Sequence, residues 1–304
     1  VLRRNESIRA RRWHRPLTGN RLGTSHYSGS MKNPAAARRF AESHHLTALF
    51  DAPDATKDKS PFESVDASNK EPYRPEWDDL TTLFALVRQR KVTQVMEFGC
   101  GFSTSVLAHA LSLNERDFGR EVSRNLRRTN PFHVTAVDDM PEFVEVTKRR
   151  AAALADRIHF HVAPVRMTMF NGRICTEYET LPNLCPDFIY LDGPSQNSPV
   201  GDIIGISTRH PDRLPMACDI LRIEHFLLPG TLILVDGRTA NARFLKANLQ
   251  REWRYEYDVE ADQHYFEMIE EPLGIWNRRQ LEFCLGSDWR SRPLKPVLDA
   301  TPRS

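Results

Sequence analysis

The sequence has no closely paired cysteines and no long apolar run. Its five cysteines are widely spaced over 304 residues, and none forms a Cys-x-x-Cys pair. This spacing argues against a zinc site and against a disulfide framework, and it indicates reduced thiols in a cytoplasmic protein. Because no run of about 18 apolar residues occurs, we expect no membrane-spanning helix.

Charge of one sign and hydrophobic content are also low. The formal net charge is +2, so the chain as a whole does not indicate a nucleic-acid partner. A hydrophobic fraction of 40% and 20 prolines are typical of a chain with irregular parts outside its core. The length allows one large domain with extensions.

We divide the chain into three parts. Residues 1–75 are an irregular N-terminal extension, and its first 24 or so residues hold seven arginines against one acidic residue. We expect this basic segment to be disordered, and the alternative is an arm that binds RNA or another anion. Residues 76–270 form the main domain, and residues 271–304 form a C-terminal extension.

Short β-rich runs alternate with helical periodicity across the main domain. We expect strands over residues 92–98, 132–137, 158–162, 187–191 and 231–235, and helices over 76–90, 103–113, 141–155, 215–226 and 240–252. Strands separated by helices pair in parallel. Two further strands, 254–259 and 264–269, are close enough to form a hairpin. The prediction is an α/β fold with a doubly wound, mostly parallel seven-stranded sheet that ends in an antiparallel hairpin.

A glycine turn lies between the first expected strand and its helix. Gly99 and Gly101 allow the backbone to approach a ligand closely, beside the free N–H groups of a helix start. Thr104 stands where the dinucleotide fingerprint G-x-G-x-x-G requires a third glycine, so that fingerprint is incomplete. Glu97 precedes the turn and suits a ligand with a positive amine or sulfonium. A purely structural turn is the alternative.

Two adjacent acids end the second expected strand. Asp138 can accept hydrogen bonds from a ribose diol, and charge-assisted bonds of this kind are worth about 1.5–3 kcal/mol each. Asp139 is the alternative acceptor. Because Met140 and Pro141 follow, we expect Asp139 to cap the next helix.

These motifs together resemble the class I, Rossmann-like S-adenosylmethionine (SAM) dependent methyltransferases, and among them the small-molecule O-methyltransferases. The family has an acid before G-x-G, here Glu97-x-Gly99-x-Gly101, and an acid that closes the second strand, here Asp138. It also has an acid that closes the fourth strand, here Asp192, and an L-x-P-G turn before the fifth strand, here Leu227–Gly230. The resemblance covers residues 76–270 and implies a SAM site. Its residues would be Glu97, Gly99, Gly101, Ser103, Thr104, Asp138, Asp139, Met140 and Asp192.

The acceptor chemistry is expected where the fourth and fifth strands end. Asp192 and Asp236 follow these strands, and each is a candidate catalytic residue. His210 is a further candidate base, in the polar segment 195–214 that we expect to cover the site as a lid. Four arginines indicate an anionic or carbohydrate-like small-molecule acceptor; these are Arg209, Arg213, Arg238 and Arg243.

A metal site is the weaker interpretation of the same region. Asp192, Asp236 and Asn241 resemble the oxygen ligands of metal-dependent catechol-type O-methyltransferases. In those enzymes the amide is adjacent to the acid, whereas here it lies five residues on. We therefore assign no metal ligands, and Mg²⁺ stays an alternative.

The expected function is transfer of a methyl group from SAM to an oxygen or nitrogen of a small acceptor. An NAD(P)-dependent oxidoreductase on a similar sheet is one alternative, against which the incomplete glycine fingerprint counts. A non-catalytic protein with the SAM fold and a basic RNA- or anion-binding arm is another, because a fold does not fix an activity. Acceptor and oligomeric state stay open.

Overall fold

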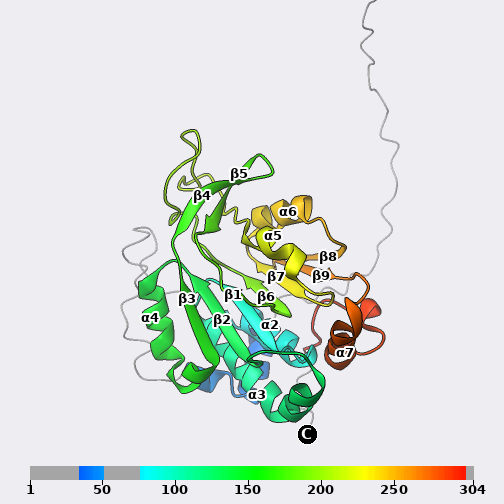
Figure 1. The fold of residues 1–304 in the computed structure, drawn as a ribbon. Coiled ribbons are helices and arrows are strands. Elements are labelled where there is room, and N and C mark those ends of the chain that lie inside the picture. Colours follow the sequence, from blue (N-terminus) through cyan, green and yellow to red (C-terminus); the bar gives the residue numbers. More distant parts are fainter. Residues whose placement is uncertain (1–33, 51–75, 299–304) are drawn as a thin grey trace, which may run out of the picture. The chain divides into compact units, whose positions relative to one another are not determined.

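The computed structural model describes residues 34–50 and 76–298 (Figure 1). The expectations for residues 1–24 and for the polar stretch 51–75 lie outside the described residues. Within the described ranges, no helix combines the length and the apolar character that crossing a membrane requires.

The main sheet of the described residues has seven strands in the order β3-β2-β1-β6-β7-β9-β8. The strands are β1 Gln94–Phe98, β2 His133–Asp138, β3 Ile158–Val162, β6 Phe188–Leu191, β7 Leu232–Asp236, β8 Trp253–Asp258 and β9 Gln263–Met268. The first five pair in parallel, and β9 pairs antiparallel with both β7 and β8. The predicted fold, with its closing hairpin, is confirmed.

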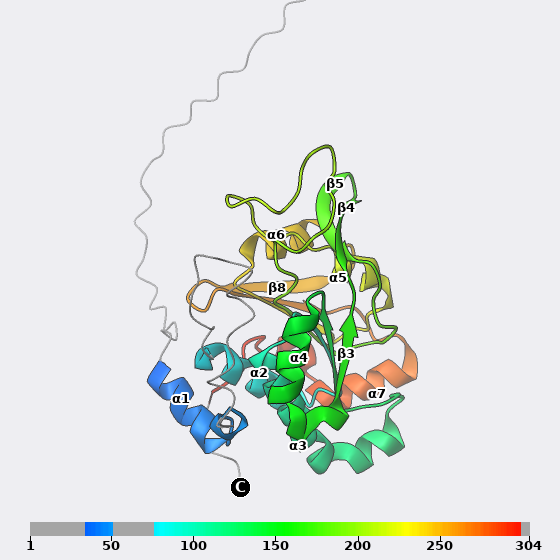
Figure 2. The same ribbon diagram turned by 90° about the vertical axis from the view of Figure 1, so that its left-hand side faces the viewer.

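Helices cover both faces of this sheet (Figures 1 and 2). The helices are α1 Pro34–Ser43, α2 Trp77–Gln89, α3 Phe102–Asn125, α4 Pro141–Arg150, α5 Asp219–Ile223, α6 Thr239–Asn248 and α7 Gly274–Leu285. One apolar cluster joins α1, α2 and α3 to one face, where Leu83 and Leu107 meet Tyr190. A second cluster joins α5 and α6 to the other face, where Leu221 and Leu245 meet the sheet. Burial on both faces explains the continuously apolar strands.

Two further strands form a ribbon that the sequence analysis missed. Strands β4 (Val165–Phe170) and β5 (Arg173–Tyr178) pair antiparallel and are joined by Asn171 and Gly172, which both have positive φ. An Asn-Gly pair between alternating runs is a strong hairpin signal, so the ribbon was detectable. Residue Val200 bonds to β4, and Met216 bonds to β5. The ribbon therefore bonds to the segment expected as a lid at Val200 and to the chain just after that segment at Met216.

Some helix bounds differ from the expected ones. Where one helix is expected over residues 215–226, the structure has the shorter helix α5, followed by a 3-10 turn at Glu224–Phe226. Residues 216–218 instead lie along β5, because the amide of Thr176 donates to Met216 and the amide of Cys218 donates to Thr176. Helix α3 runs on to Asn125, well past the expected end at residue 113.

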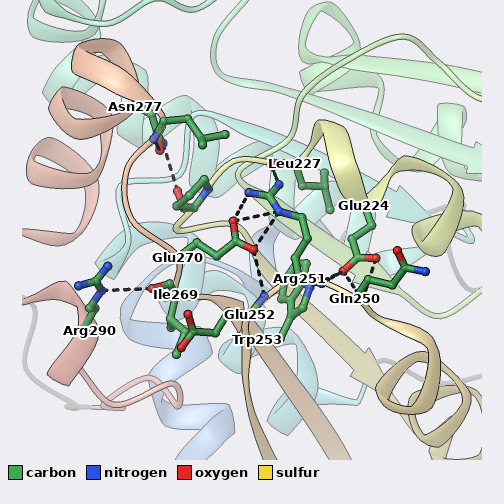
Figure 3. A network of polar contacts seen from close by, with 12 residues as sticks. Glu224, Leu227, Gln250, Arg251, Glu252, Trp253, Ile269, Glu270, Asn277 and Arg290 are labelled. Atoms are coloured by element: carbon green, nitrogen blue, oxygen red, sulfur yellow. Dashed lines mark hydrogen bonds and ion pairs between the residues drawn. The ribbon is translucent and has the colours of Figure 1, made fainter.

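Helix α7 lies within the expected C-terminal extension and reaches the amino-terminal edge of the sheet. Figure 3 shows the polar network beside its start. Arg251 pairs with Glu270 and donates to the carbonyl oxygen of Leu227 at 2.6 Å, and Glu224 accepts the indole N–H of Trp253 at 2.9 Å. The ends of β8 and β9 and the turn before β7 are thereby joined.

Candidate functional site

The ends of four parallel strands bring the predicted polar residues to one edge of the sheet. Hydrogen bonds tie the loops there to one another. The Gly99 amide donates to the carbonyl of Val137 at 2.8 Å, and the Asp192 amide donates to the carbonyl of Phe98 at 3.0 Å. The loops after β1, β2 and β6 are thus connected, and together with the end of β7 and the residues after it they form what we call the carboxyl edge.

Glu97 is fully buried below the glycine turn. The hydroxyls of Ser103 and Thr104, in the first turn of α3, donate to its two carboxylate oxygens at 2.5 and 2.6 Å. Burial raises the pKa of Glu97 to about 8, although the two hydroxyl bonds oppose the shift. Ser103 and Thr104 therefore hold Glu97, and Thr104 also accepts the Gly101 amide at 3.0 Å.

The two positions of the turn differ in why glycine stands there. Gly99 has a φ of 88°, and a Cβ built on it would lie 2.9 Å from the nitrogen of Gly193. A Cβ on Gly193 would in turn lie 2.5 Å from the nitrogen of Gly99. Only glycine permits this approach of two backbones. A Cβ on Gly101 meets nothing within 4 Å, so this position faces open space.

Asp138 holds the glycine turn from the side. Its two carboxylate oxygens accept the amides of Cys100 and Met140, each at 2.8 Å, and burial raises its pKa. The expected cap of α4 is wrong: Met140 occupies the N-cap position and no side chain caps the helix. Asp139 is half-buried and hydrogen-bonded to Ser198, and burial also raises its pKa.

Asp192 and Asp236 lie at the ends of neighbouring strands. Asp192 is an exposed residue that directly follows β6. Its pKa is raised to about 7, first because the surrounding protein desolvates the carboxylate and second because of the negative charge of Asp236. Asp236 accepts the hydroxyl of Tyr190 at 2.9 Å. Tyr190 itself lies within β6, and burial raises the pKa of its phenol well above 10. The structure thus brings the two predicted acids together.

The segment 195–214 is held mostly by its own polar contacts. His210 is exposed, and its Nδ1 accepts the amide of Asp212 at 3.1 Å. No contact found in the described residues joins its ring to Asp192 or Asp236, so its catalytic role stays a prediction. Arg209 donates to the carbonyl of Gly201, and Arg213 donates to that of Ser207. These two arginines stabilise the segment itself.

Asn241 does not complete a metal site. Its amide oxygen accepts the N–H of Ala217 and its amide nitrogen donates to the carbonyl of Ala217, each at 2.9 Å, and the side chain is fully buried. Asn241 therefore fixes the strand-like segment before α5. Among the residues that the structure describes, no three of the types His, Cys, Asp and Glu gather as a metal site.

Two residues of the carboxyl edge have partners that the sequence does not indicate. The hydroxyl of Tyr190, a residue not named in the sequence analysis, donates to Asp236. Arg238, which was named there for an anionic acceptor, donates to the carbonyl oxygens of Asp192 and Pro194, each at 2.6 Å. The Asp-Gly-Pro and Asp-Gly-Arg sequences marked the two loops, but nothing in them signals that they bond to each other.

Comparisons with known proteins give a likeness in fold. No protein-family model matches the sequence, and no curated protein matches it. Solved structures that it resembles include the O-methyltransferase TomG from Streptomyces achromogenes in complex with SAM, at 14% identity, with 80% of this chain and 92% of that chain covered and a TM-score of 0.36. An O-methyltransferase from Bacillus cereus with SAH shares 14% identity over 77% of this chain and 100% of that one, with a TM-score of 0.39. The SAH-bound methyltransferase from Podospora anserina shares 12% identity over 80% and 91%, with a TM-score of 0.39.

Proposed function

We propose that this chain is a SAM-dependent methyltransferase that acts on an oxygen or nitrogen of a small acceptor. The observation that carries the proposal is the carboxyl edge itself. A buried acid lies below an open glycine turn, a second acid lies beside the turn, and a third acid reaches solvent next to both. The solved structures add a likeness in fold, and the proposal rests on the site.

The residues present fit SAM on two grounds. Asp138 is a carboxylate beside the turn, held by the amides of Cys100 and Met140, and a carboxylate can accept the hydroxyls of a ribose. Gly101 leaves open space above the turn. The residues that would contact the cofactor are Gly101, Asp138, Asp139 and Met140, and those that would support the turn from below are Glu97, Gly99, Ser103 and Thr104.

Bound SAM supplies an electrophilic methyl group. This chain's part is to hold the acceptor in line, and orientation of that kind is worth roughly 7–11 kcal/mol in favourable cases. Asp192 is the proposed general base for a hydroxyl or ammonium acceptor. With a pKa of about 7, its Oδ atoms can take a proton near neutral pH. Asp236, held by Tyr190, supplies negative charge beside it.

The charge of the edge indicates the kind of acceptor. Two of the arginines first assigned to an anion, Arg209 and Arg213, bond to carbonyls of their own segment, and Arg238 bonds to two loop carbonyls. Asp192 and Asp236 are the groups beside the turn. We therefore propose a neutral hydroxyl or an amine as the acceptor group, in place of an anion.

Calorimetry tests the proposal. SAM and S-adenosylhomocysteine should bind, and NAD and NADP should not. Asp138→Ala should weaken SAM binding at least tenfold, because one charged hydrogen bond is worth about 1.5 kcal/mol or more.

Asp138→Asn keeps the side-chain volume but removes the charge and replaces one of the two acceptor oxygens by a donor, and the exposed Asp288→Ala is the matched control. Thermal unfolding of each variant verifies that it folds. Unchanged SAM affinity in Asp138→Ala would reject the ribose assignment, and preferential NAD binding would reject the proposed function.

A further inference from the structure

Arg238 joins two loops of the carboxyl edge. It follows β7 as the N-cap residue of α6, and its Nη1 and Nη2 donate to the carbonyls of Asp192 and Pro194, each at 2.6 Å. The two donors of one planar guanidinium therefore span Gly193. A lysine ammonium has no such fixed fork, so the contact is specific to arginine.

The backbone of Asp192 is held from the opposite side as well. Its amide donates to the carbonyl of Phe98 at 3.0 Å, and Gly193 packs against Gly99. Both polar groups of this residue's backbone thus have fixed partners on two other loops. The side chain alone extends towards solvent.

We propose that Arg238 is a positioning residue that fixes the peptide on each side of Gly193 and so directs the Asp192 carboxylate at the acceptor. This inference rests on the proposed function of Asp192. Nη1 and Nη2 of Arg238 are engaged with the loop carbonyls of Asp192 and Pro194, and its Nε is buried without a hydrogen-bond partner among the described residues, so the role that these contacts support is one through Asp192.

The charge of Arg238 matters in the same place. The charged groups that raise the pKa of Asp192 are acidic; they are Asp236 at the end of β7, Glu76 before α2 and Asp138 of β2, and the charge of Asp192 in turn raises the pKa of Glu97 of β1. Arg238 is the cation that opposes them and lowers the pKa of Asp192, while burial lowers the pKa of Arg238 itself. Arg238 thus sets both the direction and the protonation of Asp192.

The experiment compares Arg238→Gln, Arg238→Lys and the control Lys246→Gln, which removes an exposed charge from the same helix. Hydrogen–deuterium exchange is followed in residues 189–198. We expect about tenfold faster exchange in both Arg238 variants, because each loses the two-carbonyl fork, and no change in the control. Unchanged exchange in both Arg238 variants overturns the proposal.

The second readout is the titration of Asp192 by ¹³C carboxyl resonances, assigned through their loss in Asp192→Asn. Arg238→Gln should raise the pKa of Asp192 by about one unit or more, whereas Arg238→Lys retains the charge and should shift it less. A purely structural Arg238 would leave the titration unchanged, and equal shifts in Lys246→Gln would also overturn the proposal.

Arg238→Lys keeps the test valid if Arg238→Gln does not fold. Neither readout needs SAM, so a failure of SAM binding in calorimetry rejects the proposed function separately.

Discussion

The two edges of the sheet differ in the partners of their acidic side chains. At the amino-terminal edge, buried Glu267 pairs with Arg90 at 2.7 Å and also with Arg254. At the carboxyl edge, acids lie near other acids, and the charge of Asp236 is one of the causes that raise the pKa of Asp192. Paired charges stabilise the fold, whereas unbalanced acids with raised pKa values are typical of functional sites.

Breaking the Arg90–Glu267 ion pair at the amino-terminal edge should have the largest effect on stability. Arg90 is 5% exposed and Glu267 is 0% exposed, so Arg90→Ala leaves a buried carboxylate with one partner fewer. We expect a loss of about 3–5 kcal/mol in the free energy of unfolding, measured by denaturant titration. The exposed Arg116→Ala is the control and should cost less than about 1 kcal/mol. SAM affinity of the folded variant should be unchanged. Equal costs for the two variants would contradict the contrast between the edges.

An acid at each edge should make the free energy of unfolding depend on pH in opposite directions. The pKa of Glu97 is raised from 4.5 to about 8, so its contribution to stability is complete below pH 4.5 and is lost as the pH rises through 8. The unfolding free energy should therefore fall between pH 5 and 8 by on the order of 3–4 kcal/mol through Glu97, and Glu97→Gln should remove this fall.

Glu270 is the matched control at the other edge. Arg251 lowers the pKa of Glu270, so its contribution is present above 4.5 and is lost as the pH falls. Glu270→Gln should therefore leave the slope between pH 5 and 8 as it is. A slope that Glu97→Gln does not change would show that the buried acid is not protonated in the folded state.

A third substitution tests the contact between the loops of the carboxyl edge. In Gly193→Ala the new Cβ would lie 2.5 Å from the nitrogen of Gly99, and neither backbone has a flexible side chain to move aside. We expect a loss of about 1–3 kcal/mol in stability and weaker SAM binding in calorimetry. The control is Gly119→Ala in α3, where the Cβ meets only Glu115 at 3.3 Å. Full SAM affinity in Gly193→Ala would mean that the two loops move independently.

Much of the site was predictable because it lies where strands end. The β-rich run before Gly99 and the run before Asp192 indicated two parallel strands, and such strands bring their carboxyl ends to one edge. The prediction that Asp139 caps α4 was wrong, because Met140 occupies the N-cap position and no side chain caps the helix. The β4–β5 ribbon was missed although Asn171–Gly172 marked it.

The sequence by itself determined the order of strands and helices and the acids and glycines that end or follow the strands. These features depend on periodicity and turn chemistry within a few neighbouring residues. The tertiary structure alone decided which partner each polar group has. Arg238 bonds to a carbonyl 46 residues away, and Arg90 bonds to a carboxylate 177 residues away. Burial and pKa depend on such distant neighbours, because desolvation and charge act through space and not along the chain.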